Sequence, residues 1–579
     1  MSLKLFVIID IDTKLENLKQ VQGCKKGLGR AVFTSSQAQC LPSKREALLK
    51  MKHHLSDTSN RLASWSPYGI NCCNWEFVVC NNITGHILEL HLTTPPPFLH
   101  ETSIFGGELH SSTLDLKDLN CLDLSGNDFG YMQIPTFLVS MASLRYLNLS
   151  HAGFGGSIPH HFWNLSNLIY LDLGGNLFEG SIPHQIGSLS NLIHLDLRSN
   201  YYLNGSIPHQ IGNLSNLLHL GLGGNSFNGS IPQEIGNLSN LNYLQVEGSI
   251  PNGIQNLTLL QHLDLSQNLF NSSIPNWLYS FSHLKSLILS DNSLVGTISS
   301  NIGNLTSLVT LDLSGPIHSS LGNLASLKHL DLSNNAINEE LASSLGNLTS
   351  LISLCLWDNA IHGAFASWLE NLTSLMLLDL TNNQLNGNPF EIIGKAPNCW
   401  MTWPYLKIVN LENNHFTGIL NISMGSFPWL IMLNLRVNNF FGNFPTFLKN
   451  TSNLIFLDLG KNQFLKRIPT WIGQKLSNLK ILVLRSNKFC GPILRQICGM
   501  IKELLLKGRV YDYSTTLGLI ANVDFSCNEL SGVIPTEITA LKRLHFSNFS
   551  NNHFIGQIPQ NIDNMKSLES GFFKKSSFR

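Results

Sequence analysis

Aspartate recurs at one position of a repeated pattern in this chain, and a carboxylate can act as a general acid or base. A unique pair of carboxylates would suggest a catalytic centre. Here the residue returns in almost every unit of the pattern, which indicates a role in the architecture and not one catalytic pair. The members of this column are Asp172, Asp196, Asp264, Asp312, Asp331, Asp379 and Asp458.

Histidine recurs in the same way, two residues before the aspartate position. His194, His219, His262 and His329 all occupy it. If the units form neighbouring strands, His194 and His219 lie within roughly 5 Å of each other, close enough for a metal pair. We favour the simpler interpretation of solvated histidines on a polar surface, and therefore predict no metal site and no cofactor.

No motif of a known catalytic machinery accompanies these residues. The chain contains no P-loop, no set of kinase motifs and no G-x-S-x-G elbow. The net charge is zero, with 37 basic and 37 acidic residues, so no basic field favours nucleic acid. We therefore predict a protein that is not an enzyme and does not bind nucleic acid.

A repeat positions all of these residues. Leu165 to Ser188 reads LSNLIYLDLGGNLFEGSIPHQIGS. Leu189 to Asn213 repeats it with one inserted residue, and Leu214 to Asn237 repeats it again. Such a period is the signature of a solenoid. The core of a solenoid grows by stacking, so 579 residues need not form one compact core.

Each unit is expected to contribute one short strand. In the unit above, the L-x-x-L-x-L pattern places three leucines inside and Tyr170 and Asp172 outside. The Asn176 amide can satisfy inward-facing backbone groups where the chain leaves the strand. About 20 such units predict a curved solenoid with a parallel inner sheet. The coils after Leu244 and Leu313 are short, and we expect each to pinch the solenoid locally.

The presence or absence of the leucine repeat divides the chain into five segments. Residues 1–39 carry no repeat and are interpreted as a degraded secretory leader or a disordered N-terminus. Residues 40–85 combine a helical pattern with two tryptophans and four cysteines, and would cap the first coil. Residues 86–500 form the solenoid, and 501–520 are a shortened island without repeats. Residues 521–579 hold the final repeats, which look truncated, without a C-terminal cap or a transmembrane helix.

The repeat motif L-x-x-L-x-L-x-x-N-x-L/F-x-G-x-I-P, as in Leu168 to Pro183, resembles the plant-specific class of leucine-rich repeat. Its G-x-I-P element recurs at Gly205, Gly229, Gly248, Gly532 and Gly556. The segment CLPSKREALLKMKHHLSDTSNRLASW…NCCNWEFVVC looks like the cap of plant leucine-rich-repeat receptor-like proteins. That family includes Cf-type resistance proteins and receptors for fungal xylanase. This chain differs from the pattern at Phe77, where the cap usually has glycine.

The resemblance implies an α/β repeat, a right-handed curved solenoid with a helical, disulfide-tied cap. It also implies an extracellular ligand-recognition protein without a kinase, acting at the plasma membrane in plant defence or developmental signalling. Its ligands would be microbial or endogenous peptides, proteins or glycans, and its partners receptor kinases that act as co-receptors. One alternative is a soluble, secreted inhibitor of microbial wall-degrading enzymes. Another is a non-functional truncated receptor paralogue.

Eleven cysteines suit an oxidising compartment. A zinc site in the cap is the alternative, although adjacent cysteines suit tetrahedral ligation poorly. Cys121 and Cys355 lie on expected strands and are predicted to be free. By resemblance to the family, the cap holds two disulfides, Cys40–Cys72 and Cys73–Cys80.

N-x-S/T sequons indicate a glycoprotein if the chain enters the secretory route. The alternative is that the repeat itself requires N-L-S/T at that corner, and both can hold. Asn148 falls within a strand on the inner face, so a glycan there would block ligand. The acceptors are Asn82, Asn148, Asn164, Asn204, Asn213, Asn228, Asn237, Asn256, Asn271, Asn304, Asn347, Asn371, Asn421, Asn450 and Asn548.

Unusual residues at outward strand positions are the best candidates for ligand binding, because exposed aromatic and arginine side chains are what binding hot spots use. Trp357 stands out because it replaces the small residue usual at its position. The alternative is that these are scattered exposed hydrophobics of no consequence. The predicted set on the concave face is Tyr146, Tyr170, Arg198, Trp357, Met432, Arg436, Phe456 and Arg485.

Overall fold

The structure is a computed structural model of the chain. It describes residues 39–68, 71–94, 104–268, 273–292, 298–313, 318–365, 367–389, 403–420, 427–493, 495, 521–540, 544–559, 570–572 and 577–578. The predicted leader and the island at 501–520 lie outside these ranges. The chain forms two compact units, Met1–Asn268 (unit 1) and Leu269–Arg579 (unit 2).

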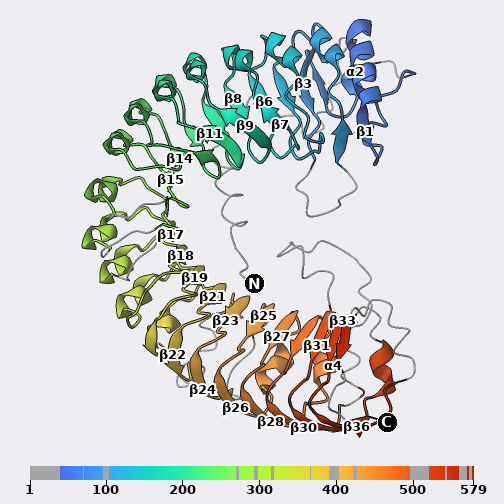
Figure 1. Cartoon of the computed structure of the whole chain (residues 1–579), viewed down its shortest axis with the longest axis vertical. Helices are drawn as coiled ribbons and strands as arrows, with labels where there is room; N and C mark the ends of the chain where they lie inside the picture. The colour runs from blue at the N-terminus through green and yellow to red at the C-terminus, as the bar shows by residue number, and fades with distance from the viewer. Residues whose placement is uncertain are drawn as a thin grey trace. The chain divides into compact units, whose positions relative to one another are not determined.

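In both units, each coil adds one strand to an inner parallel sheet (Figure 1). In unit 1 these are β3 (Ile87–His91), β5 (Cys121–Asp123), β6 (Tyr146–Asn148), β8 (Tyr170–Asp172), β10 (His194–Asp196), β12 (His219–Gly221), β14 (Tyr243–Gln245) and β15 (His262–Asp264). In unit 2 they are β16 (Ser286–Ile288), β17 (Thr310–Asp312), β18 (His329–Asp331), β19 (Ser353–Cys355), β21 (Leu377–Asp379), β23 (Ile408–Asn410), β25 (Met432–Asn434), β27 (Phe456–Asp458), β29 (Ile481–Val483), β31 (Ala521–Asp524), β33 (Leu544–Asn548) and β35 (Ser570–Phe572). The predicted leucine-rich-repeat solenoid with a parallel inner sheet is confirmed.

A second set of short parallel strands follows the inner strands, and the sequence interpretation missed it. Its signal is the alternation in segments such as Leu177–Ser181, where only Phe178 is buried. In unit 1 these strands are β7 (Gly155–Ser157), β9 (Leu177–Ser181), β11 (Tyr202–Gly205) and β13 (Ser226–Phe227). In unit 2 they are β20 (His362–Ala364), β22 (Gln384–Gly387), β24 (His415–Ile419), β26 (Asn439–Gly442), β28 (Gln463–Lys466), β30 (Lys488–Gly491), β32 (Glu529–Gly532), β34 (His553–Gly556) and β36 (Ser577–Phe578).

The chain returns to the next inner strand through one-turn 3₁₀ helices, which begin just after the I-P element in most coils. Ile186 in η6 (His184–Ser188) and its counterparts are fully buried and fill the back of each coil. The others are η3 (Ser111–Asp115), η4 (Thr136–Ser140), η5 (His160–Asn164), η7 (His209–Asn213), η8 (Gln233–Asn237), η9 (Asn252–Asn256), η10 (Asn276–Ser280), η11 (Ser300–Asn304), η12 (Ser319–Asn323), η13 (Ser343–Asn347), η14 (Ser367–Asn371), η16 (Thr446–Asn450) and η18 (Thr536–Ala540), with a short α-helix, α4 (Ile472–Lys475), in one coil.

Buried asparagines join consecutive coils. Asn176 is 3% exposed. Its Nδ2 donates to three backbone carbonyl oxygens at 2.8–3.2 Å, and its Oδ1 accepts from the N–H groups of Ala152 and Phe154. Backbone groups left inside by the turn are thereby satisfied, as the sequence predicted. The same arrangement recurs at Asn127, Asn200, Asn383, Asn414, Asn438, Asn462, Asn487, Asn528 and Asn552.

The short coil after Leu244 interrupts the second sheet of unit 1. Residues 246–251 are all described and contain no strand, so this sheet ends at β13. Asn268 of the next coil compensates, because its Oδ1 accepts from the N–H of Gly248 and its Nδ2 donates to Val246. The corresponding residues after Leu313 lie outside the described ranges.

The cap covers the first coil of unit 1. Helix α2 (Pro42–His54) begins at a proline, which suits the first helical turn. It ends at His54, because the next residues form β1 (Leu55–Asp57), which pairs antiparallel with β4 (Phe105–Gly107). After η2 (Cys72–Asn74), β2 (Val78–Cys80) pairs antiparallel with β3. The buried rings of Trp65 and Trp75 stack beneath.

Two features of the cap involve residues that the sequence singled out. The structure contains the disulfides Cys40–Cys72 and Cys73–Cys80. Phe77 has a φ of +71°, the left-handed region that favours glycine. This backbone conformation explains why glycine is expected there. The Phe77 ring packs edge-on against Phe105, with the Arg61 guanidinium 5.2 Å from its centre.

Candidate functional site

Aromatic rings on consecutive inner strands of unit 1 stack face to face. The rings belong to Tyr146, Tyr170, His194, His219 and Tyr243, and we call them the ring ladder. Neighbouring ring centroids lie 4.1–4.2 Å apart, and the ring planes differ by 6–16°. The strands pair in register, so each ring lies directly opposite the next.

The ladder corrects two expectations about exposure. Tyr170 is only 6% exposed, and His219 only 9%, whereas an exposed tyrosine and solvated histidines were predicted. The physical reason is the spacing of β-strands, about 4.8 Å, which brings flat rings on adjacent strands into stacking contact. Tyr146, His194 and Tyr243 are half-buried. The inner face therefore presents ring edges and polar atoms instead of ring faces.

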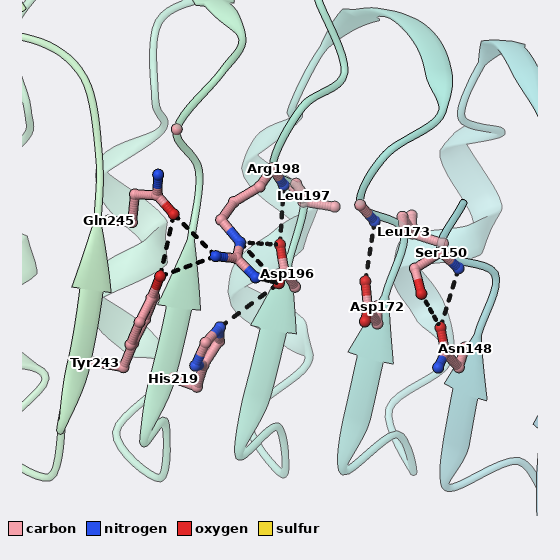
Figure 2. A network of polar contacts seen from close by, with 12 residues as sticks. Asn148, Ser150, Asp172, Leu173, Asp196, Leu197, Arg198, His219, Tyr243 and Gln245 are labelled. Atoms are coloured by element: carbon pink, nitrogen blue, oxygen red, sulfur yellow. Dashed lines mark hydrogen bonds and ion pairs between the residues drawn. The ribbon is translucent and has the colours of Figure 1, made fainter. Parts of the chain in front are cut away.

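Arg198 lies at the centre of a polar network beside the ladder (Figure 2). Its Nε donates to both carboxylate oxygens of Asp196 at 2.9–3.0 Å, and its Nη2 lies 2.7 Å from Oδ2. Its Nη1 donates to the hydroxyl of Tyr243 and to Oε1 of Gln245 at 2.9 and 3.1 Å. Arg198 thus ties β10 to β14, two strands away.

Glycine at position 221 lets the Arg198 side chain cross β12. A Cβ on Gly221 would lie 2.9 Å from Arg198 Cγ and 2.9 Å from Asp196 Oδ1. Most other coils carry an aspartate or asparagine at this position. The replacement in Leu220-Gly221-Leu222 was visible in the sequence, and it was the signal for a long side chain passing over this strand.

The electrostatics of the network are set by burial and by Arg198. Burial raises the pKa of the Asp196 carboxyl, but the positive charge of Arg198, together with the nearby His219 ring, outweighs burial and holds that pKa well below its usual range. His219 Nε2 lies 3.7 Å from Asp196 Oδ2. At neutral pH the carboxylate is therefore ionised and paired.

Two groups of side chains in the described residues have donor types that bind metals. In the first, donor atoms of His194, Asp196 and His219 lie within 4.8 Å of one another, but Arg198 already binds the Asp196 carboxylate. The second contains Glu89, His91 and Cys121. Cys121 is disulfide-bonded, which corrects the prediction that it is free and removes its thiolate as a ligand. Cys355 is free and buried.

The aspartates of the repeated column accept hydrogen bonds from backbone N–H groups. Asp172 Oδ1 accepts from the N–H of Gly174 at 3.0 Å, just beyond the end of its strand. Other members accept from the residue two positions on, as Asp379 does from Thr381. These contacts shape the strand exit, and they support an architectural role for the column.

The predicted residues of unit 2 lie on several coils. Met432 and Phe456 lie opposite each other on β25 and β27. Arg436 donates to Glu412 Oε1 at 3.0 Å, and both are partly exposed. Trp357 is half-buried on another coil, and Arg485 is exposed.

Asp458, at the end of β27, is 6% exposed, and burial raises the pKa of its carboxyl to about 7. An acid with a raised folded-state pKa stabilises the fold fully below its unfolded pKa of about 3.9, and that stabilisation is lost as pH rises through 7. Asp458→Asn should therefore gain stability relative to the native chain between pH 4 and pH 8, by up to about 4 kcal/mol.

Denaturant midpoints of the two proteins across that pH range would measure this difference. The asparagine keeps an oxygen that can accept from the N–H of Gly460, as Asp458 Oδ1 does at 2.7 Å. A difference that stays constant with pH would contradict the raised pKa.

The sequons differ in exposure. Asn148 is 9% exposed on the inner sheet, and its Oδ1 accepts from the N–H and hydroxyl of Ser150. Asn204 and Asn228 are exposed beside the second sheet. Asn271 and Asn421 lie outside the described residues.

Family models match much of this architecture. The leucine rich repeat N-terminal domain matches residues 41–81. A leucine-rich repeat region matches residues 102–247, and single leucine-rich repeats match 259–281, 283–305 and 326–348. Receptor-like protein EIX2 of Solanum lycopersicum is 40% identical over 126 residues, and EIX1 of the same species is 37% identical over 132. The chain is a leucine-rich-repeat protein that is similar to plant receptor-like proteins.

The matches to individual relatives are partial. The EIX2 match covers 21% of this leucine-rich-repeat protein and 12% of EIX2. The EIX1 match covers 22% of this chain and 13% of EIX1. The chain therefore aligns with about an eighth of each relative.

Solved structures align over more of the repeat array. The ectodomain of the Arabidopsis receptor kinase HAESA, in complex with an extended IDA peptide hormone, has a TM-score of 0.63 and 27% identity, covering 92% of this chain and 93% of that one. The plant peptide hormone receptor RGFR1 in complex with RGF2 has a TM-score of 0.58 and 30% identity, covering 87% and 84%. HAESA with IDA and the co-receptor SERK1 has a TM-score of 0.57 and 27% identity, covering 93% and 94%.

The described helices of this leucine-rich-repeat protein are short. The longest of them, α2, has 13 residues, whereas a membrane-spanning helix needs about 20 predominantly apolar residues. Within the described ranges, none has the length and apolar character of a membrane span.

Proposed function

We propose that this chain recognises a peptide or protein ligand outside the cell, through the inner sheet face of unit 1, and that it does so without catalysis. One observation carries the proposal: the ring ladder and the Arg198 network occupy adjacent positions on the same strands, β10 to β14. Tyrosine and arginine are the residues that binding hot spots use most.

The rigidity of this face supports the proposal. Each ladder ring is held by its neighbours, and Arg198 is held by three side chains, so little side-chain freedom would be lost on binding. The guanidinium N–H groups of Arg198 are already bonded to Asp196, Tyr243 and Gln245. Arg198 therefore positions Tyr243 and Gln245 in the free protein. Direct contact with a ligand would come from the ring edges of Tyr146, His194 and Tyr243.

The relatives suggest the class of ligand and partner. The HAESA and RGFR1 structures hold peptide hormones, and one HAESA structure also holds a co-receptor. We extend both features to this chain: a peptide ligand, and signalling through a partner receptor kinase at the plasma membrane. A role in plant defence or development belongs to the same proposal.

Selection from a library of short random peptides tests the binding face. We expect His194→Lys to lower the binding affinity of the selected peptides at least about tenfold, the loss typical of a hot spot. Ser190→Lys is the matched control, because it adds the same charge at an exposed corner of the same repeat, and binding there should change less than about twofold. Equal effects of both variants would refute the inner face as the site.

A further inference from the structure

An open groove lies on the outer face of the second sheet in unit 1, away from the ring ladder. Its volume is about 430 Å³, and strands β9 and β11 contribute to its lining. Tyr201 and Tyr202 border it and are 66% and 57% exposed. Gly180 leaves room at its floor, since a Cβ there would meet no atom within 4 Å. Two tyrosines this exposed mark a place where ring surface is available to a ligand.

The groove is a local feature and not a property of every repeat. It arises in the coil with the inserted residue, where Asn200 is followed by Tyr201 and Tyr202. The previous coil has Leu177 after its asparagine, and the following coil has Ser226. An insertion that adds exposed aromatic surface is not needed for the repeat fold.

Asn204 in the same strand is the acceptor of an N-x-S sequon, Asn204-Gly205-Ser206. Residues two apart in a strand point to the same face. Tyr202 and Asn204 are accordingly both exposed and both line the groove, while Leu203 between them is 1% exposed. Asn204 Nδ2 donates to the carbonyl of Tyr202 at 3.3 Å. A glycosylated amide keeps one N–H, so this bond can persist after sugar attachment.

The chemistry of the groove matches a sugar ring. The C–H face of a pyranose is apolar and slightly positive, so it packs on the negative face of an aromatic ring. Its hydroxyl groups need donors and acceptors around the rim. Glu179 and Ser226 supply carboxylate and hydroxyl oxygens beside the tyrosines.

We propose that Asn204 carries an N-linked glycan whose first sugar packs on the Tyr202 ring, so that the chain's own glycan occupies the groove. The inference requires passage through the secretory pathway, but it is independent of the ligand proposed for the ring ladder. It distinguishes Asn204 from Asn228, the exposed sequon one coil later, which has no tyrosine two residues before its asparagine.

Two other sequons provide matched comparisons. Tyr146-Leu147-Asn148-Leu149-Ser150 has the same tyrosine two residues before its asparagine, but Asn148 is buried and Tyr146 stacks on Tyr170. Asn228 occupies the position of Asn204 one coil later, in Asn228-Gly229-Ser230, and is exposed. Ser226 stands in place of the tyrosine, so a glycan on Asn228 has no ring two residues earlier in its own strand.

The test uses the full chain secreted from plant cells. Glycopeptide mass spectrometry should find Asn204 occupied. In the native protein, a peptide N-glycosidase should release the Asn204 glycan about two- to tenfold more slowly than the Asn228 glycan, the factor that an aromatic contact corresponds to. After denaturation the two rates should agree.

Substitutions identify the ring. Tyr202→Ser should remove the slow release at Asn204, and Tyr202→Phe should retain it. Ser226→Tyr should slow release at Asn228. The proposal is overturned if folded, secreted protein lacks sugar at Asn204, or if Tyr202→Ser leaves the ratio of the two rates unchanged.

Discussion

Replacing Asn176 by alanine should destabilise unit 1 by about 3–5 kcal/mol, the range found when a buried hydrogen-bond network is broken. The substitution removes five hydrogen bonds at once. It leaves the N–H groups of Ala152 and Phe154 and at least two carbonyl groups buried without this partner. Such groups cost about 1–3 kcal/mol each when water cannot reach them.

Chemical denaturation of the purified chain would measure the loss. Asn191→Ala is the matched control, because Asn191 is exposed and makes one hydrogen bond to the neighbouring coil, to Ser166 at 2.9 Å. We expect a cost there below about 1 kcal/mol. Similar costs for both variants would show that the buried asparagines do not hold the coils together.

Loss of the Cys40–Cys72 disulfide should destabilise the cap by about 3–4 kcal/mol, from the entropy of the chain segment that it closes. The bond joins residues 32 positions apart, and Cys72 is fully buried. Without it, the stacked Trp65 and Trp75 would no longer be held over the first coil. Exposure of this apolar end would also favour aggregation.

Limited proteolysis together with thermal unfolding of a Cys40→Ala/Cys72→Ala variant would detect this change, with cleavage beginning inside residues 40–85. Cys355→Ala serves as the control, because Cys355 is a buried free cysteine of unit 2. It should leave the protease resistance of the cap intact. A variant that keeps a protease-resistant cap would contradict the role given to the disulfide.

Much of the fold was predictable because the residue pattern within each repeat determines the local geometry of its coil. The L-x-x-L-x-L pattern fixes which side chains of a strand are buried, and Leu168, Leu171 and Leu173 are all fully buried. The role of Asn176 followed from the need to satisfy inward-facing backbone groups. The second sheet was missed because segments such as Leu177–Ser181 are short and contain only one buried residue.

The candidate site was harder to predict, because it depends on contacts between repeats. Tyr146 and Arg198 were identified from their outward positions, but stacking that buries Tyr170 appears only when neighbouring strands are in register. Arg198 reaches Tyr243 because position 221 is glycine, a relation across three coils that no single repeat contains. The disulfide bond of Cys121 also depends on tertiary proximity and not on local pattern.

The most direct test of ligand recognition by unit 1 is to map where a bound peptide lies. A peptide selected on the secreted chain would carry a photoreactive group, and mass spectrometry would locate its cross-links. We predict cross-links on the inner strands from β6 to β14, between Tyr146 and Gln245. Cross-links confined to unit 2, or to the outer face of the second sheet, would contradict this prediction.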